Sequence, residues 1–173
     1  MLHTARLRLR PPTLLDASAL FECYARDPEV ARFMTWRPHR SARNTQAYLR
    51  RLLQAWQRGT SQPWVITARA SGRPLGLIEL RPSGHRAEIG YVLGRPWWGQ
   101  GFMTEAAGAV VDWALEHPTI HRVWAVTDVD NRASARVLEK TGMTREGRLR
   151  AWLIHPNLSP EPRDCWCYAR IRS

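Results

Sequence analysis

Residues 91–106 read YVLGRPWWGQGFMTEA and pass from a β-type apolar run through a short glycine-bearing loop into an alanine-rich helix. Glycine lets the backbone approach a ligand without a clash from Cβ. The unpaired N–H groups in the first turn of a helix, together with the helix dipole, favour an anion. The stretch therefore predicts a cradle for phosphate groups, although a lone Gly-x-Gly also occurs in ordinary strand-to-helix turns.

The residues around these glycines narrow the choice of anion. Gly94 and Gly99 have the spacing of a nucleotide-triphosphate P-loop, but Lys and Ser or Thr are missing from the next two positions, Gln100-Gly101. A dinucleotide fingerprint also fails, because Thr104 stands where a third glycine or alanine would let the helix pack closely. The pattern that remains predicts a pyrophosphate held by backbone amides without a metal ion.

A second informative stretch lies further along the chain. Residues 131–143, NRASARVLEKTGM, follow the β-type run Val123–Thr127 and predict a helix that is capped by asparagine and ended by glycine. In this order and spacing, the two stretches resemble the acetyl-CoA-binding motifs of the GNAT N-acetyltransferase superfamily. The resemblance runs nearly end to end, from Thr4–Pro11 to Arg163–Ala169. It is to the RimJ/RimL-like branch, the ribosomal-protein-alanine acetyltransferases.

The length and composition fit one α/β domain over residues 1–173. With 44% of its 173 residues apolar, the chain can bury one full core but not two comfortable ones. No apolar run approaches membrane-spanning length, and Arg6, Arg8 and Arg10 alternate with leucines as in a strand rather than a secretory leader. We therefore expect a cytoplasmic protein without a membrane partner.

Net charge and cysteine content limit the partners and metal ions that the chain could bind. A formal net charge of +11 gives an electropositive surface that raises encounter rates with CoA phosphates, acidic peptides or ribosomal RNA, without choosing among them. Cys23, Cys165 and Cys167 lack the spacing of a zinc or redox site, so we expect reduced thiols and no metal. Association with the ribosome and formation of a dimer both stay open.

Hydrophobic patterning predicts the element order β-α-α-α-β-β-β-α-β-α-β-β. This order is a mixed α/β fold, and the resemblance implies a mostly antiparallel sheet of about seven strands, flanked by helices and splayed at the acetyl-CoA site. The expected elements include helices over 17–24, 41–58 and 104–116, a hairpin of 64–68 with 75–80, and strands over 88–93, 121–127, 148–154 and 165–171.

The resemblance also implies which residues hold acetyl-CoA. Backbone groups of Tyr91, Val92 and Leu93 would face the pantetheine arm and the thioester. Asn131 matches an asparagine that bonds the pantetheine amide, and it also suits a helix cap. Pro96 departs from the family, which usually has Gln or Arg there. The pyrophosphate would lie on the amides of Trp98, Gly99, Gln100, Gly101, Phe102, Met103 and Thr104.

Glu88, Tyr91 and Ser134 are the candidates for the chemistry. Acetyl transfer to an amine needs a donor for the oxyanion, a proton acceptor and stabilisation of the departing thiolate. The resemblance gives the first role to the backbone at Tyr91 and the third to Ser134, since Leu138 stands where many relatives carry a tyrosine. Glu88 could accept the amine proton through water, or it could be a surface carboxylate paired with Arg86.

The acceptor side is less determined. In the family, the loop at 34–39, with Trp36 and Arg37, and the proline-bearing loop at 156–162 border the acceptor, and Glu88 would face it. Each loop could equally be an ordinary connector. The few carboxylates in these loops disfavour polycationic drugs as substrates.

The leading function is direct transfer of acetyl from acetyl-CoA to a primary amine in a ternary complex, with a protein N-terminus as the first choice of acceptor. A small amine, such as an amino acid or an antibiotic, is the alternative acceptor. A non-catalytic module that binds CoA or the ribosome is the alternative from another class, because resemblance in fold does not establish activity.

Overall fold

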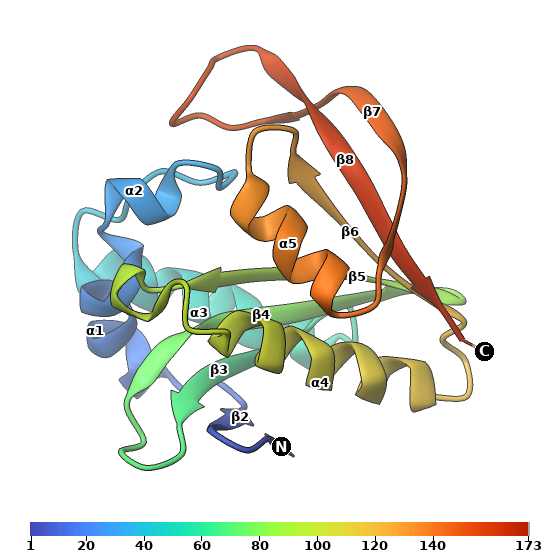
Figure 1. The fold of residues 1–173 in the computed structure, drawn as a ribbon. Helices are drawn as coiled ribbons and strands as arrows, with labels where there is room; N and C mark the ends of the chain where they lie inside the picture. Colours follow the sequence, from blue (N-terminus) through green and yellow to red (C-terminus); the bar gives the residue numbers. More distant parts are fainter. Residues whose placement is uncertain (173) are drawn as a thin grey trace.

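A computed structural model describes residues 1–172 of the chain. Its strands form an eight-stranded sheet in the order β1-β2-β3-β4-β5-β6-β8-β7, with neighbours antiparallel except for β5 and β6 (Figure 1). The very short β1 is the strand beyond the seven that the sequence predicts. The strands are β1 Leu2–His3, β2 Leu7–Arg10, β3 Gln62–Ala68, β4 Pro74–Ser83, β5 Arg86–Leu93, β6 Arg122–Asp128, β7 Thr144–Ile154 and β8 Pro162–Ile171.

Helices cover both faces of the sheet and divide the core in two. Helices α4 and α5 pack on one face, over a core that includes Val110 and Tyr168. Helices α1 and α3 pack on the other, over Val65, Leu77 and Val92. Figure 1 shows α4 in front of the sheet and α3 behind it. The helices are α1 Ala17–Leu20, α2 Pro28–Ala31, α3 Ala42–Gln57, α4 Phe102–Glu116 and α5 Arg132–Lys140, with 3₁₀ helices at Leu14–Asp16 and Arg95–Trp97.

The sheet opens between β5 and β6. These strands pair only from Arg86 to Glu88 of β5, against Arg122 to Trp124 of β6. Beyond that point β6 continues along β8 while β5 continues along β4. The splay expected at the acetyl-CoA site is confirmed, and α5 lies beside it (Figure 1).

Most expected elements are confirmed, with shifted ends. Helix α3 begins after Ser41, whose capping box with Asn44 fixes its start. Helix α4 begins at Phe102, before the expected residue 104, because Gly101 already adopts the left-handed N-cap conformation. The two late strands are longer than expected, since β7 and β8 pair along most of their lengths.

The first helical segment differs from the continuous helix expected over 17–24. A 3₁₀ turn at Leu14–Asp16 precedes α1, and a π-helix, Phe21–Ala25, follows it. The π-helix carries Tyr24, which is 2% exposed. Such stretches are rare and frequently mark functional sites.

Two further expectations concern thiols and membranes. The thiols of Cys23, Cys165 and Cys167 are free, and Cys165 is fully buried. No helix within residues 1–172 has the length and apolar character needed to cross a bilayer.

Candidate active site

The loop between β5 and α4 presents a row of backbone N–H groups. Gly99 and Gly101 have φ angles of 73° and 78°, in the left-handed region that favours glycine. Within residues 1–172, the N–H groups from Gly99 to Thr104 have no hydrogen-bond acceptor. Unpaired amides at the amino end of a helix form an anion site. The loop therefore has the geometry of the predicted pyrophosphate cradle.

The cradle is one residue shorter than the sequence predicts. Trp98 donates its backbone N–H to the carbonyl of Arg95 at 3.1 Å, which closes a short 3₁₀ helix, so this amide is already used. The Trp98 indole Nε1 donates to the Leu93 carbonyl at 2.8 Å. Pro96 lies in the first turn of that helix, where a missing N–H costs nothing. The unusual proline is thus accommodated.

Arg6 braces the loop from the first strands of the sheet. Its guanidinium donates to the Gln100 carbonyl at 3.0 Å, pairs with Glu105 at 2.7 Å and lies 4.3 Å from the Phe102 ring centroid. Burial raises the pKa of Glu105, but hydrogen bonds from Thr4 and Arg6 outweigh it and hold that pKa below its ordinary value. Because Arg6 pairs with Glu105, the carboxylate of Glu105 is not an unpaired negative charge beside the cradle.

The register of β5 decides which of its amides face the opening. Gly94 donates to the Leu75 carbonyl of β4, and antiparallel bonding to one neighbour recurs at every second residue. The N–H groups of Tyr91 and Leu93 therefore point away from β4, toward the side where β6 has diverged. Val92, by contrast, directs its N–H to β4 and its side chain to the α3 face. Of the three expected backbone contacts, Val92 is the one that the register does not support.

Tyr91, Asn131 and Ser134 come together across the opening. The Tyr91 hydroxyl lies 2.9 Å from Ser134 Oγ, and it donates to the Ser134 carbonyl at 3.3 Å. The Asn131 side chain accepts the Ser134 backbone N–H at 3.2 Å and caps α5. Burial raises the pKa of Tyr91, so its hydroxyl stays protonated. The sequence predicts a role for the Tyr91 backbone, whereas this contact is made by the Tyr91 side chain.

Glu88 lies apart from that cluster and is paired differently from the expectation. Its partner is Arg81 on β4, at 2.9 Å, rather than Arg86. Arg81 also binds Glu79, at 2.9 Å. Burial lowers the pKa of Arg81, but its bonds to Glu88 and Glu79 outweigh that and raise it. Glu88 is three residues before Tyr91, roughly 10 Å along the strand, and its carboxylate is already bound by the Arg81 guanidinium.

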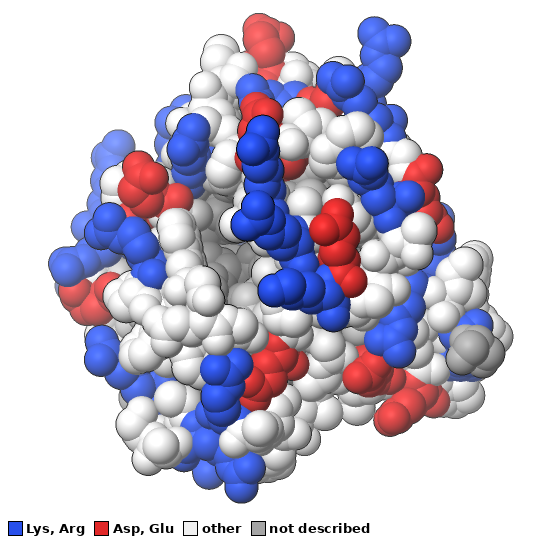
Figure 2. Space-filling view, in the orientation of Figure 1, with Lys and Arg blue, Asp and Glu red and all other residues white. Residues whose placement is uncertain are grey.

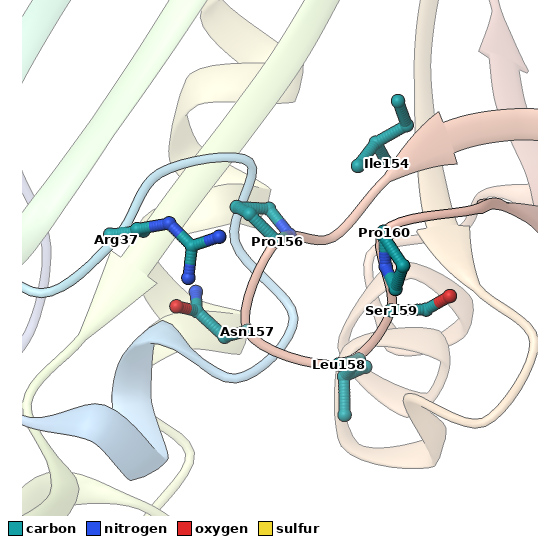
Figure 3. A pocket seen from close by; sticks show the side chains of 7 residues that line it. All are labelled: Arg37, Ile154, Pro156, Asn157, Leu158, Ser159 and Pro160. Atoms are coloured by element: carbon teal, nitrogen blue, oxygen red, sulfur yellow. The ribbon is translucent and has the colours of Figure 1, made fainter.

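Arg37 and Trp36, the residues expected to border the acceptor, each line a cavity. A cavity of about 420 Å³ lies between Arg37 and the loop after β7, and Figure 3 shows Arg37 and Asn157 projecting toward one another. A second cavity, of about 430 Å³, lies over Trp36 and the side chain of Val92. Asn157 Nδ2 donates to the carbonyls of Ala31 and Trp36 at 2.6 and 2.8 Å, which ties the two loops together.

Sequence reasoning missed most of the second cavity. Its other lining residues come from the π-helix, the loop before α3 and one face of α3, and no local motif singles them out. They include Tyr24, His39, Tyr48, Arg51, Ala55 and Arg58.

A buried charged cluster lies at the end of β6. The fully buried Asp128 side chain, at the end of β6, accepts from Arg163 Nε at 2.6 Å and Nη2 at 3.1 Å. His155 Nε2 lies 3.5 Å from the same carboxylate. Burial raises the pKa of Asp128, but the bonds from Arg163 outweigh it and hold that pKa below its ordinary value.

Positive charge gathers at the edge of the site. Figure 2 shows Lys and Arg side chains over α5, beside a hollow in this face of the molecule. Arg132, Arg136 and Lys140 of α5 are exposed and are spaced four residues apart, so they form one stripe. The stripe gives the hollow an electropositive edge suited to a phosphorylated ligand.

The splayed sheet, the amide cradle and the positive edge define an enzyme that binds a CoA thioester. The chain matches the family model described as "Acetyltransferase (GNAT) domain" over residues 6–144. The chain therefore belongs to the GNAT acetyltransferase family and is an acetyl-CoA-dependent N-acetyltransferase.

Three similar proteins illustrate this membership. The chain is 33% identical over 156 residues to the uncharacterized N-acetyltransferase YoaA of Bacillus subtilis, covering 88% of each chain. It is 32% identical over 75 residues to the [ribosomal protein uS5]-alanine N-acetyltransferase of Escherichia coli, covering 43% of this chain and 39% of that one. Its fold matches that of RimL, the ribosomal L7/L12 α-N-protein acetyltransferase, in complex with coenzyme A, with a TM-score of 0.86 at 24% identity, over 97% and 95% of the two chains.

Acetyl-CoA fits the residues of this site. Unpaired amides from Gly99 to Thr104 match a pyrophosphate, and the amides of Tyr91 and Leu93 match the arm that crosses the splay. Among residues 1–172, no cluster of three His, Cys, Asp or Glu side chains is arranged to hold a metal ion.

Proposed function

We propose that the enzyme acetylates the α-amine at the N-terminus of a protein, by direct attack in a ternary complex. The observation that carries this proposal is the chemistry of the two cavities beside Trp36 and Arg37. Their linings contain arginine, aromatic and proline side chains, and no Asp or Glu among the residues that the structure describes. A polycationic antibiotic would need carboxylates there, whereas a peptide N-terminus needs an open groove.

Each step of the transfer has a candidate group. Acetyl-CoA supplies an activated carbonyl, and the N–H groups of Tyr91 and Leu93 are the candidates to bind its oxygen as negative charge develops. Ser134, held by Tyr91 and Asn131, is the candidate to donate a hydrogen bond to the departing sulfur. The cofactor contacts proposed for Gly99 to Thr104 fix the thioester in this position.

The proton of the amine is handled largely by electrostatics. Positive charge near an amine disfavours its ammonium form, so the arginines around the cavities favour entry of the neutral nucleophile. Glu88 then serves only as a distant proton acceptor through water, because Arg81 already binds it.

The relatives support a protein acceptor. The uS5-alanine acetyltransferase and RimL are named for ribosomal proteins. If this enzyme also modifies ribosomal proteins, it acts in the cytoplasm and meets the ribosome, which its net charge of +11 favours. A small amine remains the second candidate acceptor.

The test is thiol release from acetyl-CoA with short peptides, free amino acids and aminoglycosides as competing acceptors. We expect peptides to give the highest kcat/KM. The Ser134→Ala variant should lower kcat about tenfold to a hundredfold while acetyl-CoA affinity is kept. Preference for an aminoglycoside would overturn the protein acceptor, and unchanged turnover in Ser134→Ala would remove Ser134 from the chemistry.

A further inference from the structure

The second cavity contains a buried hydroxyl that lacks a partner. Tyr24 is 2% exposed and lines the cavity, and its hydroxyl has no hydrogen-bond partner within the described part of the chain. Burial raises the pKa of Tyr24 well above its ordinary value, so the group is a neutral phenol able to donate. An unpaired buried hydroxyl is costly, and a ligand atom in the cavity would satisfy it.

The walls around Tyr24 are aromatic. The ring of Trp36 lies 6.3 Å from that of Tyr24 and 5.5 Å from that of His39, and Tyr48 lies 6.1 Å from His39. Burial and the charge of Arg51 lower the pKa of His39, so its ring is neutral. A cavity of about 430 Å³ with such walls suits a large planar group and is far larger than an alanine or serine side chain requires.

The charges at the cavity are both positive. Arg51 of α3 and Arg58, the C-cap residue of that helix, line it, and both are exposed. The nearby Glu79 carboxylate is already bound by Ser61 at 2.6 Å and by Arg81 at 2.9 Å. Arg51 and Arg58 are two helical turns apart, roughly 10 Å, which is about three residues of extended peptide.

The cavity also lies next to the acetyl donor. Successive side chains of a strand point to opposite faces, so Val92 lines the cavity while Tyr91 reaches Ser134 on the other face. A group seated on Val92 therefore lies against the same strand, β5, that carries the amides of Tyr91 and Leu93.

From these features we infer that the second cavity binds the first side chain of the acceptor protein, and that this residue is aromatic and is followed by acidic residues. The aromatic ring fills the cavity between Trp36 and Tyr48, and the carboxylates of the following residues pair with Arg51 and Arg58. This inference rests on the proposed function, and it names the acceptor class.

The experiment uses four short amidated peptides that combine Phe or Ala in the first position with Glu-Glu or Lys-Lys in the next two. With acetyl-CoA in excess, we expect Phe-Glu-Glu to have a kcat/KM about tenfold or more above each peptide that differs in one feature. The reason is that burial of the ring and pairing of the carboxylates are separate contributions.

Two variants separate these contributions. Arg51→Gln with Arg58→Gln should abolish the preference for Glu-Glu over Lys-Lys and keep the preference for Phe. Ala55→Phe, a change at a half-buried lining position, should fill the cavity and abolish the preference for Phe over Ala. The matched control is Arg43→Gln with Arg50→Gln, which removes two exposed arginines of α3 outside the cavity. Unchanged acetyl-CoA affinity shows that each variant is folded.

Three outcomes count against the inference. Equal or better acetylation of the Ala peptides would overturn it and leave the protein acceptor standing. Loss of the acidic preference in the Arg43 and Arg50 control as well would show a general charge effect and overturn the roles of Arg51 and Arg58. Acetylation of free phenylalanine with none of the peptides modified would overturn both the inference and the proposed function.

Discussion

The proposed donor and acceptor sites differ in the groups that form them, which are backbone amides in one and side chains in the other. The contacts proposed for acetyl-CoA come mostly from backbone amides, from Gly99 to Thr104 and along β5, so conformation would matter more than side-chain identity. On the acceptor side, side chains from the π-helix, the 34–39 loop and α3 line the cavity. A donor site of this kind suits one constant ligand, whereas an acceptor site of the other kind can change its specificity by substitution.

The sharpest test of this contrast is a change at a backbone contact. We expect Gly101→Asp to weaken acetyl-CoA binding by about 4 kcal/mol, roughly a thousandfold, because a carboxylate would lie beside the pyrophosphate. Arg6 cannot compensate fully, since Glu105 already binds it. Titration calorimetry with acetyl-CoA measures the loss.

Gly101→Ala is the matched control. It imposes the same left-handed φ of 78° on a residue with Cβ, but adds no charge, so the loss should be only about 1 kcal/mol. Equal affinities for the Asp and Ala variants would mean that the phosphates do not lie at this loop.

The same contrast explains what the sequence could predict. The cradle and α5 are local, so their glycine and asparagine spacing is visible in one stretch each. The spacing predicts an amide contact from Trp98 as well, because it does not reveal that this amide closes a 3₁₀ turn. The partner of Glu88 depended on the β4–β5 register, which places Arg81 opposite it. Tyr24 and Tyr48 look like ordinary core aromatics until distant segments bring them together.

The Asp128 cluster tests whether the two sides are independent. We expect Arg163→Ala to lower the free energy of unfolding by about 3 kcal/mol at neutral pH, because it leaves a buried carboxylate unpaired. Acetyl-CoA affinity should fall and acceptor KM should rise, since Asp128 lies between β6 and α5 and beside His155. Denaturant unfolding and both binding assays measure these effects.

The pH dependence of this loss has a definite sign. Because the folded pKa of Asp128 is depressed, its contribution is present above its unfolded pKa, about 3.9, and is lost as pH falls through the folded value. The difference between wild type and Arg163→Ala should therefore shrink below about pH 4. Arg148→Ala removes the more exposed pair with Asp164 and should cost much less, because water screens an exposed ion pair. Equal losses in the two variants would contradict a special role for the buried pair.

The smallest expected effect is confined to the acceptor side. Asn157→Ala removes the two hydrogen bonds that hold the carbonyls of Ala31 and Trp36, so the aromatic wall should lose its fixed position. We expect acceptor KM to rise by about fivefold, near 1 kcal/mol, with acetyl-CoA affinity unchanged. Ser159→Ala is the control, because within residues 1–172 the Ser159 hydroxyl bonds only inside its own loop, where it accepts from the Glu161 N–H. A parallel loss of acetyl-CoA affinity in Asn157→Ala would show that the loop couples the two sites. The donor and acceptor sites would then be separate in their contacts but not in their binding energies.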